Sequence, residues 1–131
     1  MNTVIGSLLI LCILPIICAW IAAYFRQQQL GSIDNKEPRI QSQQLSGAGA
    51  RAVAAQGNSW EALAIFSAAA LALFIAGVDL QSVSTLAMVF VALRIAYIPA
   101  YIANVDILRS LIFIGGFGIC LYFFYLALSA N

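Results

Sequence analysis

The sequence predicts an all-α membrane protein, a single domain over residues 1–131 in which four transmembrane helices form an up-and-down bundle. The first observation is the composition: 63% of the 131 residues are hydrophobic, 8% are charged and the mean hydropathy is +0.98. Soluble domains carry about 25% charged residues. The second observation is that the apolar residues form four runs, each long enough to cross a hydrocarbon core of about 30 Å. One long polar connection follows the first run, and the other connections are short.

The first predicted span covers residues 3–26. It contains Pro15, which membrane helices tolerate when neighbouring groups satisfy the freed carbonyl. Trp20 and the aromatic residues after it precede Arg26, a pattern typical of the interface at the cytoplasmic end of a helix. The chain starts without the basic residues of a signal peptide, so we expect this helix to be retained.

Residues 27–47 are predicted to form a solvated cytoplasmic loop that ends in a glycine-rich turn. The segment is rich in glutamine and contains Lys36 and Arg39, with Arg26 and Arg51 at its edges. Basic residues concentrate in short cytoplasmic loops, so this side is predicted to face the cytoplasm. An even number of spans then places both termini on the other side of the membrane.

The remaining spans are predicted at residues 48–77, 83–103 and 107–129. The turn between the second and third spans contains Asp79 and no basic residue, which agrees with an external position. Asp106 is placed to cap the fourth span. Within the fourth span, small residues leave room for close approach of a neighbouring helix, namely Gly115, Gly116 and Gly118.

Charge and residue types exclude several functions. The net charge of +1 argues against nucleic acid as a partner, since binding it requires a dense basic surface. The chain has no histidine, and its three cysteines lie in apolar runs without a metal-ligand spacing, so no metal site is predicted. We interpret the cysteines as small hydrophobic residues.

A polar stripe opens the second span. Arg51, Asn58 and Glu61 fall within roughly 80° of one another on a helix. The apolar run that follows them carries no charge up to Val78. Polar groups this close to a membrane are costly, so the stripe is a candidate functional site.

A second stripe lies on the third span, where Arg94, Tyr97 and Tyr101 recur at i, i+3 and i+7. Arg94 is deep enough to require an anion, because an unpaired guanidinium in a membrane costs several kcal/mol. Glu61 is the carboxylate at a comparable depth, so we predict an ion pair between Arg94 and Glu61, within the bundle or across a subunit boundary. The alternative that this pair only locks two helices together remains open.

These residues project to the polar cytoplasmic half of the bundle, where Arg51, Arg94 and Arg109 outnumber the one carboxylate, Glu61. Such an excess suits an anionic ligand, because guanidinium groups hold carboxylates in a bidentate fork and Asn or Tyr adds directional hydrogen bonds. The pattern therefore predicts an anion-binding pocket between the helices.

The order Arg51-x6-Asn58-x2-Glu61, then Arg94-x2-Tyr97-x3-Tyr101-x7-Arg109-Ser110, resembles the MAPEG superfamily, the membrane-associated proteins in eicosanoid and glutathione metabolism. The resemblance covers nearly the whole chain, and the sequence is more similar to the bacterial branch of this superfamily. It implies a homotrimer in the bacterial inner membrane, in contact with lipids, that binds glutathione as co-substrate and acts on a lipophilic small molecule. By resemblance, Arg109 is the catalytic residue that stabilises a glutathione thiolate. The residues that the resemblance implies in glutathione binding are Arg26, Arg51, Asn58, Glu61, Arg94, Tyr97, Tyr101 and Ser110.

Three functions stay open. The first is a glutathione transferase or peroxidase acting on lipophilic electrophiles. The second is a non-catalytic membrane binder or scaffold for lipid headgroups or another small anion, favoured by Ala54 and Gln56 where relatives often carry basic groups. The third, a small four-helix drug exporter, is disfavoured because the first span has no membrane-embedded carboxylate.

Overall fold

A computed structural model describes residues 1–130 and contains four long helices and one short helix. The four long helices are apolar and long enough to cross a membrane. The helices are α1 (Asn2–Leu30), α2 (Pro38–Ser42), α3 (Gly47–Ile75), α4 (Ser84–Ile102) and α5 (Asp106–Leu128). The predictions of an all-α fold and of a multi-pass integral membrane protein are confirmed.

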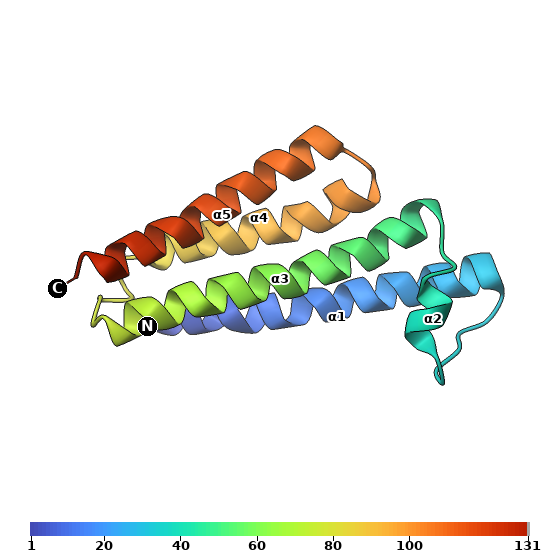
Figure 1. Cartoon of the computed structure of the whole chain (residues 1–131), viewed down its shortest axis with the longest axis horizontal. Helices are drawn as coiled ribbons and strands as arrows, with labels where there is room; N and C mark the ends of the chain where they lie inside the picture. The colour runs from blue at the N-terminus through green and yellow to red at the C-terminus, as the bar shows by residue number, and fades with distance from the viewer. Residues whose placement is uncertain (131) are drawn as a thin grey trace.

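The long helices form an up-and-down bundle, as predicted. Helix α1 packs along α3, and α4 packs along α5 (Figure 1). The start of α1, the end of α5 and the turn between α3 and α4 lie at one end of the bundle, here named the termini end. Helix α2 and the turn between α4 and α5 lie at the opposite end, here named the α2 end.

The long helices begin and end within four residues of the predicted spans, and the largest difference is at the end of α1. This helix continues past Arg26 to Leu30, through glutamines that were predicted to lie in the loop. Glutamine is a good helix former, so polarity alone did not mark the boundary. The helix ends where Gly31 adopts a left-handed conformation (φ 77°) and donates its N–H to Gln27 O.

The connection from α1 to α3 is ordered by one buried amide. Gln41, on the short helix α2, accepts a hydrogen bond from Asp34 N at 2.9 Å and donates one to Ser32 O at 2.9 Å. Arg26 Nη1 donates to Gln41 Oε1 at 3.3 Å. The predicted solvated loop is therefore partly helical and is fastened to the end of α1.

Aromatic side chains fill the core toward the termini end. The ring of Phe66 on α3 stacks on Phe90 of α4, with centroids 4.7 Å apart, and lies 5.9 Å from the ring of Phe123 on α5. A Cβ on Gly116 would meet the Phe90 ring at 3.3 Å, so this glycine permits the predicted close approach of α5 to α4. A Cβ on Gly118 would meet nothing within 4 Å, so that glycine does not contribute to the approach.

Candidate functional site

Guanidinium groups and tyrosine rings alternate where α4 meets α5, toward the α2 end. The guanidinium carbon of Arg94 lies 4.1 Å from the centroid of the Tyr97 ring, and that ring packs edge-on against Tyr101 at 5.6 Å. The guanidinium carbon of Arg109, from α5, lies 4.3 Å from the Tyr101 centroid. The i, i+3, i+7 spacing on α4 brings the first three side chains together, and the antiparallel turn adds Arg109. Cation–π contacts of this kind favour the charged guanidinium in a weakly hydrated place.

The predicted direct pair of Arg94 and Glu61 is wrong within one subunit. Arg94 Nη2 instead donates to Asn58 Oδ1 at 2.8 Å, and Asn58 Nδ2 donates to Glu61 Oε2 at 3.3 Å. Arg94 is 3% exposed, whereas Glu61 lies on the exposed side of α3. The half-buried Asn58 stands between them and can accept and donate at once, so it links the two charged groups.

Arg51 has a partner that the sequence did not reveal. Its Nε donates to Ile102 O at 2.8 Å, at the last residue of α4. Carbonyls at a helix C-terminus lack intrahelical partners, and a cation there also interacts favourably with the helix dipole. Arg51 therefore fastens the start of α3 to the end of α4.

Arg26 lies with the connection after α1 and makes its hydrogen bonds there. Besides Gln41, its Nη1 contacts Asp34 O at 3.4 Å. The side chain is 8% exposed, and its Nε has no hydrogen-bond partner within the part of the chain that the structure describes. The structure thus brings Arg94, Tyr97, Tyr101 and Arg109 into one cluster, and joins Arg26 to the loop instead.

A groove runs beside this cluster on the surface of α4 and α5. It is lined by Tyr97, Arg109, Ser110, Phe113 and Ile114. Arg109 is half-buried and Ser110 is exposed, so a guanidinium and a hydroxyl can reach a molecule in the groove, whereas Tyr97 lines the groove but is only 4% exposed. The groove can therefore hold an anionic group near Arg109 while its apolar walls contact a lipophilic one.

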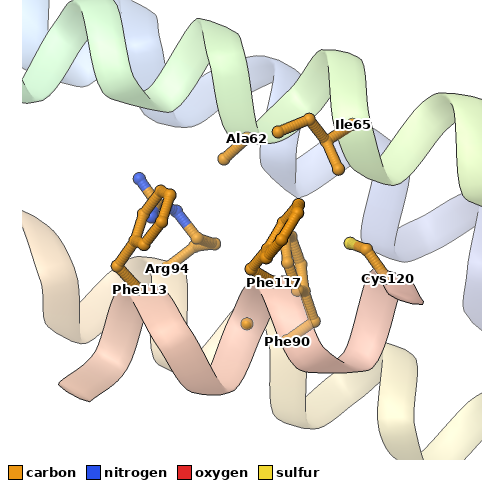
Figure 2. Close-up of a pocket in the computed structure, with 8 residues that line it drawn as sticks. Ala62, Ile65, Phe90, Arg94, Phe113, Phe117 and Cys120 are labelled. Carbon is orange, nitrogen blue, oxygen red and sulfur yellow. The ribbon is translucent and has the colours of Figure 1, made fainter. Parts of the chain in front are cut away.

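A second, smaller hollow lies between α3, α4 and α5 and includes residues that the sequence analysis did not select (Figure 2). Arg94 and Cys120 contribute its polar atoms, and Phe113 borders both the hollow and the groove. Cys120 lies in an apolar run and is 1% exposed, so its residue type gave no signal of a cavity. The run of small residues beginning at Gly115 was the available clue.

Comparison with family models gives one match, to the MAPEG family, over residues 3–129. Comparison with curated proteins and with solved structures gives no match. The matched range covers all the candidate residues described above.

Proposed function

Because the chain belongs to the MAPEG family, we propose that it binds glutathione in the groove between α4 and α5 and uses it as co-substrate on lipophilic electrophiles. The observation that carries the proposal is the position of Arg109. Its guanidinium stacks on Tyr101 and lines the groove beside Ser110. Asp106, the acidic residue three positions before it, accepts a hydrogen bond from Ile107 N, and the guanidinium itself contacts the Tyr101 ring, so we assign the charge of Arg109 to an anion in the groove.

The chemistry assigned to Arg109 is stabilisation of a thiolate. A guanidinium close to the glutathione sulfur favours loss of the thiol proton, and the thiolate is the nucleophilic form. The sulfur then forms a bond to an electrophilic carbon, while the bond to the leaving group breaks and its electron pair departs with that group. With an organic hydroperoxide, the same sulfur attacks the terminal oxygen, the O–O bond breaks and the alcohol leaves, so that a glutathione sulfenic acid remains. The thiol of a second glutathione then attacks this sulfur, the S–O bond breaks with loss of water, and the disulfide forms.

The other candidate residues divide by what they contact. Tyr97 and Ser110 line the groove beside Arg109, and Tyr101 supports its guanidinium, so we assign these three to glutathione binding. Arg94 and Asn58 shape the pocket from behind through their mutual hydrogen bond. Arg51 and Arg26 are assigned a positioning role, since each is bonded to backbone or side-chain groups of its own subunit.

Glu61 supports the proposal of a homotrimer. It lies at the middle of the 29-residue helix α3, on the exposed side of one subunit. A carboxylate facing lipid at that depth costs several kcal/mol, so a neighbouring subunit or the ammonium group of glutathione is needed to cover it. Native mass spectrometry of the protein released from lipid is expected to give three copies, and a dissociated monomer would contradict the trimer.

Calorimetric titration with glutathione tests the assigned role of Arg109. Arg109→Met is expected to weaken binding about tenfold or more, because a charge-assisted contact is lost. The same substitution should affect S-methylglutathione much less, since that ligand cannot form a thiolate. Arg39→Met, which removes a cation from the exposed part of the connection, is the matched control. Equal affinities of wild type and Arg109→Met for both ligands would refute the proposal.

A second candidate function is a non-catalytic binder of lipid headgroups or another small anion. Arg51 is bonded to Ile102 O, and Ala54 and Gln56 add no charge, so few cations face the groove. Phospholipid that co-purifies and is displaced by inorganic phosphate but not by glutathione would select this function. Turnover of an aryl halide with glutathione would select the transferase.

The orientation is part of the proposal. We place the α2 end in the cytoplasm and both termini outside, in a bacterial inner membrane, because Lys36 and Arg39 gather at the α2 end. A cysteine introduced at Lys36 should be protected from an impermeant thiol reagent in intact cells, and one introduced at Asp79 should be labelled. Reversed labelling would overturn the orientation.

A further inference from the structure

The connection between α1 and α3 is held beside the last turns of α1. Figure 1 shows α2 crossing α1, set back from the end of that helix. The hydrogen bond from Arg26 Nη1 to Gln41 Oε1 joins α2 to a residue that lies four positions, or about 6 Å, before the end of α1. A Cβ on Gly49 would meet Phe25 Cβ at 3.0 Å and Leu45 Cβ at 3.3 Å, so the chain just after α2 lies level with the same part of α1. The connection therefore folds back along α1 instead of continuing away from the bundle.

Exposed aromatic side chains on α1 mark the position of the bilayer surface. Trp20 is 69% exposed and Tyr24 is 58% exposed, and such residues concentrate at the membrane interface. Arg26 follows Tyr24 by two residues, about 3 Å along the helix. The headgroup layer on each side of the hydrocarbon core is roughly 5–7 Å thick. Helix α2, which is bonded to Arg26, therefore lies at the depth of the lipid headgroups.

Two isoleucines of this polar connection are exposed. Ile33 is 44% exposed, and Ile40, within α2, is 54% exposed. The neighbouring Gln41 is buried and is bonded to Ser32 O and Asp34 N. Successive residues of a helix point about 100° apart, so fastening α2 through Gln41 leaves Ile40 directed away from these bonds. At headgroup depth, both isoleucines can bury their apolar surface at the boundary of the acyl chains.

The exposed charges of the connection leave one net positive charge. Asp34 Oδ1 accepts hydrogen bonds from Lys36 N at 2.8 Å and from Glu37 N at 3.3 Å, and the buried Arg26 donates to Asp34 O. Asp34 and Arg26 thus offset one another within the connection. The remaining charged side chains, Lys36, Glu37 and Arg39, are exposed and comprise two cations and one anion. This balance suits a surface of lipid phosphates, which attracts Lys and Arg side chains.

We propose that residues 32–42 form an interfacial anchor that binds the headgroups of anionic phospholipids, with its two isoleucines at the acyl boundary and Lys36 and Arg39 on the phosphates. A lipid surface is favoured over a protein partner because α2 lies at headgroup depth, where lipid surrounds the bundle. The bonds of Gln41 hold the segment in shape before it meets lipid, so little ordering entropy is lost on binding. The anchor does not depend on glutathione binding.

Hydrogen–deuterium exchange of the full chain in lipid nanodiscs tests the anchor, measured by mass spectrometry over residues 32–42. The nanodiscs contain phosphatidylcholine, either alone or mixed with phosphatidylglycerol. Exchange in the wild type should be about fivefold slower in the anionic mixture, the factor expected for one net charge near an anionic surface. Glu37→Gln should increase this lipid dependence, and the double variant Lys36→Gln, Arg39→Gln should reverse it. All three side chains are exposed, so these substitutions change charge without removing packing.

The apolar part of the anchor is tested in the same nanodiscs. Ile33→Ser and Ile40→Ser should each speed exchange of residues 32–42 in both lipid mixtures, because apolar burial is lost. Ile107→Ser is the matched control, since Ile107 is 73% exposed at the same end of the bundle but outside the connection, and it should leave this exchange unchanged.

Three results would overturn the anchor. The first is equal exchange of wild-type residues 32–42 in the two lipid mixtures. The second is a lipid dependence that does not change with the charge at Lys36, Glu37 and Arg39. The third is slow exchange that appears only in native vesicles containing other membrane proteins, which would assign this surface to a protein partner. A loss of glutathione binding alone would count against the proposed function and not against the anchor.

Discussion

One face of α4 packs in two different ways along its length. Toward the termini end, the ring of Phe90 stacks on the ring of Phe66, so two apolar side chains make the contact. Two to three turns further along, the rings of Tyr97 and Tyr101 each contact a guanidinium group, from Arg94 and Arg109 respectively. Aromatic residues that recur on one face of α4 therefore form a closed core at one end of the helix. At the other end they form a cluster that also contains guanidinium groups.

The closed core should be the more sensitive to truncation. Phe66 is 0% exposed, so Phe66→Ala should lower the free energy of unfolding by about 3 kcal/mol through lost packing contacts and the cavity left behind. Phe74→Ala, on the same helix but 65% exposed, is the control and should change stability much less. Unfolding in mixed detergent, followed by helical circular dichroism, measures both. Similar losses in the two variants would mean that the Phe66 region is not a closed core.

At the polar end of α4, Asn58, which accepts the hydrogen bond of Arg94, should have the largest effect on stability. Asn58→Ala leaves Arg94 without its bond from α3 and should cost about 1.5 kcal/mol, since membrane hydrogen bonds are weaker than their burial suggests. Gln56→Ala removes a second half-buried amide from α3 that does not bond to Arg94, and serves as control. The same unfolding assay applies. An unchanged Asn58→Ala protein would show that Arg94 finds another partner.

The sequence could predict that Arg94 needs a partner, but not which partner. Span length and periodicity placed Arg94, Tyr97 and Tyr101 on one face of a single helix, and the structure agrees. The identity of the partner depends on how α3 is shifted along α4, and this shift is set by side-chain packing between the helices. A shift of three residues, less than one turn, exchanges Glu61 for Asn58 as the nearest acceptor.

The same limit applies to Arg51. Its place at the start of the polar stripe was visible in the sequence, whereas its bond to Ile102 O depends on where α4 ends in space. The hollow at Cys120 needed three helices in position before it existed. Properties of one helix were therefore predictable, and properties of the space between helices were not.

Arg51 tests whether a predicted ligand residue serves the fold instead. Arg51→Met removes the bond to Ile102 O and should lower stability by about 1 kcal/mol in the absence of any ligand. Glutathione affinity, measured by calorimetry at a temperature where the variant is folded, should change less than in Arg109→Met. If stability were unchanged and affinity fell, Arg51 would belong to the ligand site.

Substitution of Arg109 should have the smallest effect on stability. It therefore tests most clearly whether the polar end of α4 binds a ligand or packs as a core, as the other end does. The contact of Arg109 with the ring of Tyr101 is half-exposed, so Arg109→Met should change the free energy of unfolding by only about 0.5 kcal/mol. Arg109→Lys, which keeps a cation near the ring, is the control and should change it less. Unfolding curves recorded with and without glutathione give both quantities, because a ligand that binds only the folded state raises its apparent stability. The added stability from glutathione should be smaller in Arg109→Met, by up to about 1.4 kcal/mol for a tenfold loss of affinity, although the ligand-free curve barely moves. If instead the ligand-free protein were destabilised as much as by Asn58→Ala, Arg109 would belong to the packing of the bundle, and the polar end of α4 would be a second core instead of a binding site.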